Sequence, residues 1–175
     1  MEALSTLHFF PDVINDNRNE AGWTPLLTAS AEQVDLKLIK LMISNGADMS
    51  KPKLDDGLTP LHFAASNNDV RFIDYVLSDI YQNNAQQIVN IENSHGWTPA
   101  HFASYLNKFD SLNLLIENGA DLTRRNGNGF SCFDEVIRQD HASLFECLWP
   151  YAKKVKRNLS DVSTYRSFHR LFLWV

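Results

Sequence analysis

The sequence predicts an all-α solenoid, in which short pairs of helices stack side by side along one axis. Three observations lead to this fold class. A nine-residue pattern beginning with glycine recurs, each clear copy is followed by an apolar segment, and two copies end in the same Asn-Gly-Ala-Asp sequence. The copies are GWTPLLTAS from Gly22, GLTPLHFAA from Gly57, GWTPAHFAS from Gly96 and the weaker GFSCFDEVI from Gly129. Their spacings of 35, 39 and 33 residues are typical of helical repeats.

A first helix is expected to begin shortly after each glycine. Thr24, Thr59 and Thr98 each precede a proline. A hydroxyl at this position can accept a hydrogen bond from the free N–H groups of the first turn, and proline has no N–H to leave unmet. Small residues follow and should keep this helix thin, so that the next helix can approach closely. These residues are Ala29, Ser30, Ala64, Ala65, Ala103 and Ser104.

The second helix of each unit is predicted to be amphipathic. In VDLKLIKLMI the apolar residues recur at intervals of three and four, which is helical spacing, and FDSLNLLI repeats that pattern. In the first of these segments the residues are Val34, Leu38, Leu41 and Met42. The second unit is about six residues longer than the third, which predicts a longer second helix or a longer turn after it.

The sequences GLTPLHFAA and NGADL resemble the ankyrin repeat, over roughly residues 22–152 and most clearly in the first three units. The resemblance implies L-shaped units whose first helices line a concave face, beside hairpin-like fingers. One unit cannot bury its own apolar side, so the units must stack. We expect a partial N-terminal capping unit (1–21), unit 1 (22–56), unit 2 with its insertion (57–95), unit 3 (96–128), a degenerate unit 4 or cap (129–152) and a basic and apolar C-terminal extension (153–175).

Two histidines occupy the same place in successive units. The resemblance implies that His62 and His101 form hydrogen bonds that tie the turn of their own unit to that of the neighbouring unit. Neither has a Cys, Asp or Glu partner at a recognised metal-binding spacing. Cys132 and Cys147 are too few for a four-ligand zinc site and are expected to be reduced and buried. We therefore predict no metal and no cofactor.

No catalytic constellation is recognisable in the sequence. A nucleophile elbow, a phosphate-binding glycine loop and a paired His–Cys signature are all missing from it. Asp134 and Glu135 are adjacent on a predicted helix and point in different directions, which disfavours a carboxylate pair acting on one substrate. The sequence therefore predicts a protein that is not an enzyme and has no small-molecule substrate.

The residue after each leading glycine should lie on a finger, and in all four units it is apolar. These residues are Trp23, Leu58, Trp97 and Phe130. They either form a stripe that contacts a partner or lie flat on the adjacent finger and serve the solenoid itself. Further candidates for partner binding, on fingertips and at the ends of first helices, are Asp55, Asp56, His95, Tyr105 and Arg138.

The hypothesis for these candidates is a partner with two kinds of contact. Basic residues would lie near Asp55 and Asp56, and an apolar anchor would lie near Trp97 and Tyr105, because aromatic residues are enriched at interface hot spots. The alternative for the acidic residues is that they form a solvated face.

Charge divides the chain into an acidic body and a basic end. Residues 1–152 contain 10 Lys and Arg against 20 Asp and Glu, a balance of −10, whereas residues 153–175 contain 6 against one, a balance of +5. The candidates for docking in this C-terminal extension are Lys153, Lys154, Arg157, Phe172 and Trp174. We favour docking on protein over contact with nucleic acid or an anionic membrane surface.

The expected function is therefore a non-catalytic protein-interaction module. It would act as an adaptor or accessory subunit that binds a protein partner through the concave face, the fingers and the extension. The alternative is a peripheral membrane- or nucleic-acid-associated protein that uses the basic extension. No apolar run approaches the roughly 20 residues of a membrane helix, and the start MEALSTLHFFPDV has no basic cluster typical of a secretory signal. An intracellular, cytoplasmic location is expected.

Overall fold

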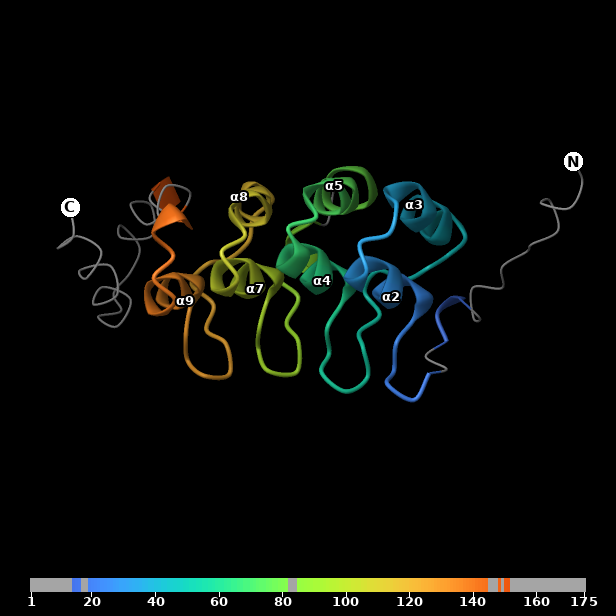
Figure 1. Ribbon diagram of the computed structural model, residues 1–175, viewed down its shortest axis with the longest axis horizontal. Helices are drawn as coiled ribbons and strands as arrows, with labels where there is room; N and C mark the ends of the chain where they lie inside the picture. Colours follow the sequence, from blue (N-terminus) through green and yellow to red (C-terminus); the bar gives the residue numbers. More distant parts are fainter. Residues whose placement is uncertain (1–13, 17–18, 82–84, 145–147, 149, 152–175) are drawn as a thin grey trace, which may run out of the picture.

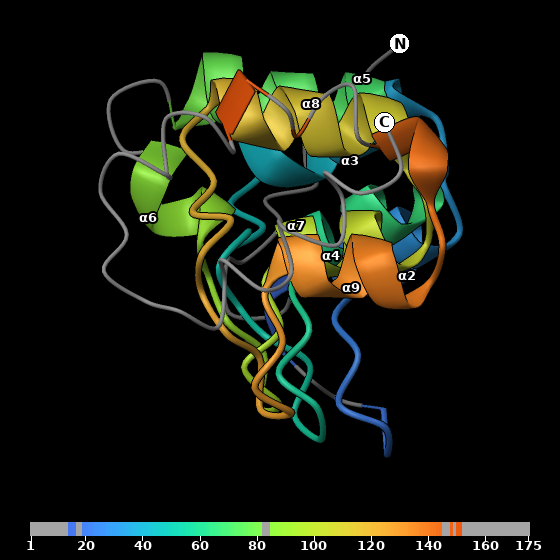
Figure 2. The ribbon, with the colours of Figure 1, turned by 90° about the vertical axis from the view of Figure 1, so that its left-hand side faces the viewer.

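The computed structural model describes residues 14–16, 19–81, 85–144, 148 and 150–151. In this part of the chain the helices form two layered rows and no strand occurs (Figure 1). The first row contains α2 (Pro25–Ala31), α4 (Pro60–Asn67), α7 (Pro99–Tyr105) and α9 (Cys132–Arg138). The second row contains α3 (Leu36–Ser44), α5 (Val70–Asp74) and α8 (Phe109–Glu117). Hairpin-like fingers project from the first row, on the side away from the second (Figure 2). The predicted all-α solenoid is confirmed.

The first helices begin at the hydroxyl residues that the sequence indicated. The Thr24 hydroxyl accepts a hydrogen bond from the Leu27 N–H at 3.2 Å, and the Thr98 hydroxyl accepts one from the His101 N–H at 3.4 Å. In unit 4 the hydroxyl of Ser131 accepts from the Asp134 N–H at 3.3 Å. Helix α9 therefore begins in the same way as α2 and α7 although it lacks the proline.

The longer sequence of unit 2 changes its second helix. Helix α5 continues without a break into a π-helical segment, η1 (Tyr75–Ile80), and an additional short helix, α6 (Ala85–Val89), follows before the next finger. Helix α6 stands to one side of the two rows (Figure 2). The insertion therefore lengthens the helix and also the connection after it, so the two alternatives drawn from the sequence both occur.

The core lies between the two rows. Its buried apolar side chains include Leu26, Ile39, Leu61, Phe72, Leu77, Ala100, Leu112, Leu115 and Phe133. The sequence grouped Leu38 and Leu41 with Val34 and Met42 on the apolar side of the second helix, but these two leucines are 44% and 58% exposed. Helix α3 carries two apolar stripes, and the one that faces the core runs through Ile39, with Met42 and Ile43 packed against it.

The remaining sequence expectation about the core concerns the two cysteines. Cys132 is a buried free thiol, and burial raises its pKa to about 12, so it is protonated and inert as a nucleophile at neutral pH. Cys147 lies outside the described residues. After α9 the chain forms a short 3-10 turn, η2 (Ala142–Leu144). Among the described helices, none is long and apolar enough to span a bilayer.

Candidate functional site

His62 and His101 connect each unit to the next finger. The His62 Nδ1 atom accepts a hydrogen bond from the Thr59 N–H at 3.1 Å, so the proton resides on Nε2, which donates to the Trp97 carbonyl at 2.9 Å. The His101 Nε2 atom lies 3.1 Å from the carbonyl of Arg124 and 3.2 Å from that of Phe130. The tie between neighbouring turns is confirmed.

Burial keeps both imidazoles neutral. Desolvation lowers the pKa of His62 to about 4 and also lowers the pKa of His101. No group of three or more potential metal ligands occurs among the described residues. In unit 4 the position holds Asp134, whose carboxylate accepts from the Ser131 N–H at 2.9 Å and from its hydroxyl at 2.7 Å. The two histidines are therefore structural groups that hold the fingers in place.

The fingers that lead into units 2, 3 and 4 are also linked through their backbones. The Ser94 N–H donates to the Asp56 carbonyl at 2.9 Å, and the Gly127 N–H donates to the His95 carbonyl at 2.7 Å. A Cβ atom at Gly127 would come within 2.8 Å of the same carbonyl oxygen, so this close approach needs glycine. The finger that carries His95 is consequently fixed against the one that carries Asn128.

The apolar residues after the leading glycines are all half-buried, but they have different neighbours. The Trp23 ring of unit 1 stacks on Phe63 of unit 2, with centroids 5.1 Å apart. The Trp97 ring of unit 3 instead contacts Phe102 at 5.1 Å and Tyr105 at 5.4 Å, both in its own unit. Trp23 thus joins two units, whereas the rings around Trp97 belong to one unit.

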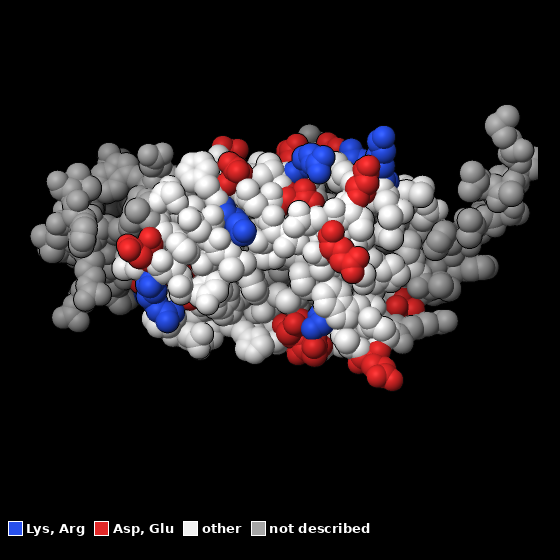
Figure 3. Space-filling view, in the orientation of Figure 1, with Lys and Arg blue, Asp and Glu red and all other residues white. Residues whose placement is uncertain are grey.

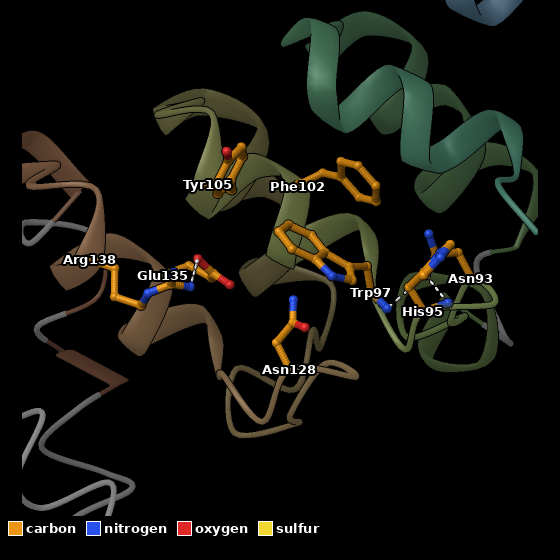
Figure 4. Close-up of a pocket in the computed structure, with 8 residues that line it drawn as sticks. All are labelled: Asn93, His95, Trp97, Phe102, Tyr105, Asn128, Glu135 and Arg138. Carbon is orange, nitrogen blue, oxygen red and sulfur yellow. Dashed lines mark hydrogen bonds and ion pairs between the residues drawn. The ribbon is translucent and has the colours of Figure 1, made fainter. Parts of the chain in front are cut away.

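A hollow of about 430 Å³ opens beside Trp97, between units 3 and 4 (Figure 4). Four residues predicted from the sequence line it, namely His95, Trp97, Tyr105 and Arg138. It is also lined by Asn93, Phe102, Asn128 and Glu135. The other predicted residues, Trp23, Asp55, Asp56, Leu58 and Phe130, are not among those that line this hollow.

The hollow is explained by one difference between the units. Counted from the leading glycine, Glu135 of unit 4 takes the position of Phe63 in unit 2 and Phe102 in unit 3. Trp23 of unit 1 is covered by that phenylalanine of the following unit. The equivalent neighbour of Trp97 is the smaller, charged Glu135, which supplies no ring to stack on the indole.

Sequence reasoning missed Glu135 because it was considered only as a possible half of a carboxylate pair. The signal that could have found it is the alignment of the four units, in which it replaces phenylalanine. Its carboxylate is 1% exposed. It accepts a hydrogen bond from the Asn126 Nδ2 at 2.9 Å and pairs with the Arg138 guanidinium at 3.4 Å. The buried charge is therefore compensated from within unit 4 and its finger.

Arg138 is held by two contacts and still faces solvent. Its guanidinium carbon lies 3.9 Å from the centroid of the Phe130 ring, in addition to the ion pair with Glu135. The side chain is nevertheless 48% exposed. The cation–π contact and the ion pair restrict the rotamers of Arg138, so its guanidinium is already positioned at the edge of the hollow.

The acidic fingertip that leads into unit 2, formed by Asp55 and Asp56, is largely paired within itself. The ammonium of Lys53, a buried residue, lies 2.6 Å from the Asp55 carboxylate and 2.9 Å from that of Asp56. The hydrogen bond with Asp55 raises the pKa of Lys53, and the same bond lowers the pKa of Asp55. Asp56 also accepts from the Leu58 N–H at 3.1 Å. A basic partner would therefore meet less free negative charge here than the sequence suggests.

Charged groups are sparse on the face seen in Figure 3, where uncharged surface separates small groups of acidic and basic side chains. The candidates for docking in the C-terminal extension lie outside the described residues. These are Lys153, Lys154, Arg157, Phe172 and Trp174.

Comparison with known proteins agrees with this architecture. A family profile for ankyrin repeats (3 copies) matches residues 2–87 and 27–126. The ankyrin repeat protein OPG189 of variola virus is 35% identical over 98 residues, which are 55% of this chain and 16% of that protein. The putative ankyrin repeat protein FPV031 of fowlpox virus is 32% identical over 117 residues, 66% of this chain and 31% of that protein.

The RelA-associated inhibitor of Mus musculus is 30% identical over 95 residues, 54% of this chain and 11% of that protein. The aligned segments thus span less than a third of the length of these three relatives. The profile match, by contrast, covers well over half of the present sequence, and the stacked helix pairs, fingers and linking histidines agree with it. The chain belongs to the ankyrin-repeat family.

Proposed function

We propose that this chain is a non-catalytic binding module, an adaptor or accessory subunit, that holds a protein partner at the hollow between units 3 and 4. Ankyrin repeats generally mediate protein–protein interactions, and the family is generally non-catalytic. The observation that carries the proposal is the hollow itself, where the rings of Trp97 and Tyr105 lie near the exposed guanidinium of Arg138. These are the three residue types that are most enriched at interface hot spots.

The hollow is suited to anchoring because its walls are fixed before a partner arrives. His62 binds the Trp97 carbonyl, and the backbone link from Gly127 to His95 joins the two fingers that border it. Binding then costs little ordering of the site. A partner side chain that fills the hollow would bury the aromatic surface that no following ring covers.

The contribution to binding of the acidic fingertip that leads into unit 2 is proposed to be secondary. Lys53 already engages both Asp55 and Asp56, so a basic residue from a partner would have to compete with an internal ion pair. Docking of the extension 153–175, on protein or on a membrane or nucleic acid, stays a prediction from its sequence.

Capture from an extract of the native cells tests the proposal. The intact chain, a Trp97→Ala/Tyr105→Ala variant and a Leu41→Ala control would be immobilised and the bound proteins quantified by mass spectrometry. Leu41 is a matched control because it is an exposed apolar residue on α3, in the second row. We expect a partner that the intact chain and the control retain and the double variant loses. A partner recovered equally by all three would contradict the proposed site, provided that circular dichroism shows the same helical content.

A further inference from the structure

The two charges that border the hollow differ in what a partner can reach. Glu135 is 1% exposed, and its oxygens already accept from Asn126 and Arg138. Arg138 is 48% exposed and its guanidinium has donors beyond the single bond to Glu135. The charge that an incoming group meets is therefore positive, although the body of the chain is acidic.

Two polar groups on the other side of the hollow are donors that a partner can use. The Asn93 side-chain oxygen is occupied, since it accepts from the N–H groups of His95 and Trp97 at 3.0 Å and 2.9 Å. Its Nδ2 group has no acceptor among the described residues. The indole N–H of Trp97, which can only donate, likewise has no hydrogen bond to any residue that the structure describes.

These donors and the aromatic rings are arranged across the hollow rather than at one point. Figure 4 shows Arg138 at one end, Asn93 at the other and the Trp97 ring between them. An extended segment lying across the hollow could place a side chain at Arg138 and its own backbone carbonyls near Trp97 and Asn93. Extended peptides present carbonyl acceptors along their length.

We propose that the hollow binds an acidic segment of a partner protein, in which a residue with a carboxylate is next to an apolar residue. The carboxylate accepts from the guanidinium of Arg138, backbone carbonyls accept from the Trp97 indole and the Asn93 amide, and the apolar side chain lies on the aromatic rings. This rests on the proposed function, because it names the chemistry of the partner at the same site.

A basic segment fits the same surface less well. It would bring a second positive charge to the exposed Arg138, while the carboxylate of Glu135 is buried and already paired. Attraction of a cation to the Trp97 ring would be its main gain. The choice between an acidic and a basic occupant is therefore decided by the charge that is accessible at Arg138.

Selection of random short peptides displayed on phage, with the full chain as the target, tests the inference. We expect the selected sequences to contain Asp or Glu beside Phe, Trp or Leu. A synthetic selected peptide would then be titrated by fluorescence anisotropy against the intact chain, Arg138→Gln, Trp97→Ala and Arg71→Gln. Arg71 is exposed on α5 in the other row and loses the same charge, so it controls for a general electrostatic effect.

Arg138→Gln should weaken the acidic peptide by roughly tenfold or more, as expected for one charge-assisted hydrogen bond, and Arg71→Gln should not. A peptide with Asn or Gln in place of the acidic residue should bind the intact chain more weakly by the same factor. This comparison does not depend on the folding of any variant. In Arg138→Gln the acidic and neutral peptides should bind alike.

The selected peptides could depend on Trp97 and yet be basic, or bind equally well without the acidic residue. Either outcome would overturn this inference and leave the proposed function standing. Failure to select any peptide that depends on Trp97 would overturn both.

Discussion

The two halves of the first row of helices, with their fingers, use the same repeat position in opposite ways. In the first half, Trp23 stacks on Phe63 of the next unit and Lys53 pairs with the fingertip acids. In the second half, the rings that Trp97 contacts among the described residues belong to its own unit, and the next unit offers Glu135 and Arg138. An aromatic residue after the leading glycine is thus scaffold where the following unit supplies a ring and candidate binding surface where it does not.

The most direct way to break this comparison is to restore the missing ring. In Glu135→Phe the new side chain should stack on Trp97, as Phe63 stacks on Trp23, and fill the hollow. Binding of the partner should fall on the order of a hundredfold, the loss typical of a central hot spot. Calorimetric titration measures it. The stability should change little, because removal of a buried carboxylate offsets the unmet amide of Asn126. Unaltered affinity in this variant would mean that the hollow is not the binding site.

The stability of the two tryptophan variants should separate scaffold from binding surface. Trp23→Ala removes a ring that joins units 1 and 2 and should lower the free energy of unfolding by about 2 to 3 kcal/mol. Trp97→Ala should cost about 1 kcal/mol less, since its ring contacts lie within one unit. Urea denaturation of both variants gives the difference. An equal loss would show that Trp97 serves the solenoid as much as Trp23 does.

The stabilisation that the buried histidines give to the fold should be lost as the pH falls. The pKa of His62 drops from 6.5 in the unfolded chain to about 4 in the folded protein, so below 6.5 the unfolded chain takes up a proton that the folded chain does not accept. This stabilisation is complete above pH 6.5 and is lost as the pH falls toward 4. Between about pH 7.5 and about pH 5 the free energy of unfolding should drop by about 2 kcal/mol from His62 alone.

The pKa of His101 is also lowered, so it should add to this drop with the same sign. Denaturation midpoints across the pH range measure the combined effect. A His62→Leu variant, which copies Leu27 at the equivalent place in unit 1, should be less stable but should show a shallower pH dependence. An unchanged slope in that variant would refute the assignment to His62.

The smallest effect is expected at the fingertip of the first half. Lys53→Gln uncovers the carboxylates of Asp55 and Asp56 and should change the free energy of unfolding by no more than about 1 kcal/mol. The variant should bind a lysine-rich peptide slightly more tightly than the intact chain does, and this binding should weaken with added salt. If the intact chain already binds that peptide as well as the variant does, Lys53 does not mask the acids.

The sequence was sufficient for features that depend on one unit at a time. Thr24 and Thr98 start helices through local capping, and His62 has the same role as His101 in the next unit. The fold could therefore be predicted from these residues. Trp97, Tyr105 and Arg138 were found as candidates by their places in the repeat. Whether these positions bind a partner is a proposal.

Features that depend on pairs of units were not predictable in the same way. The hollow arises because Glu135 faces Trp97 across a unit boundary, and the pairing of Asp55 depends on where the Lys53 side chain folds back. Leu38 and Ile39 are adjacent and both apolar, and only the stacked neighbours decide which of them is buried. The π-helical continuation of α5 has no distinct local signal, since Val76, Leu77 and Ile80 keep the spacing of an ordinary α-helix.

The irregular second helix of unit 2 has a consequence for how a partner is aligned. A solenoid of identical units has translational symmetry, so an elongated ligand could bind in several registers displaced by one unit. Unit 2 is the described unit whose second helix continues into η1 and is followed by α6. This breaks the symmetry of the second row. A partner that contacts both rows can therefore be bound in a single register.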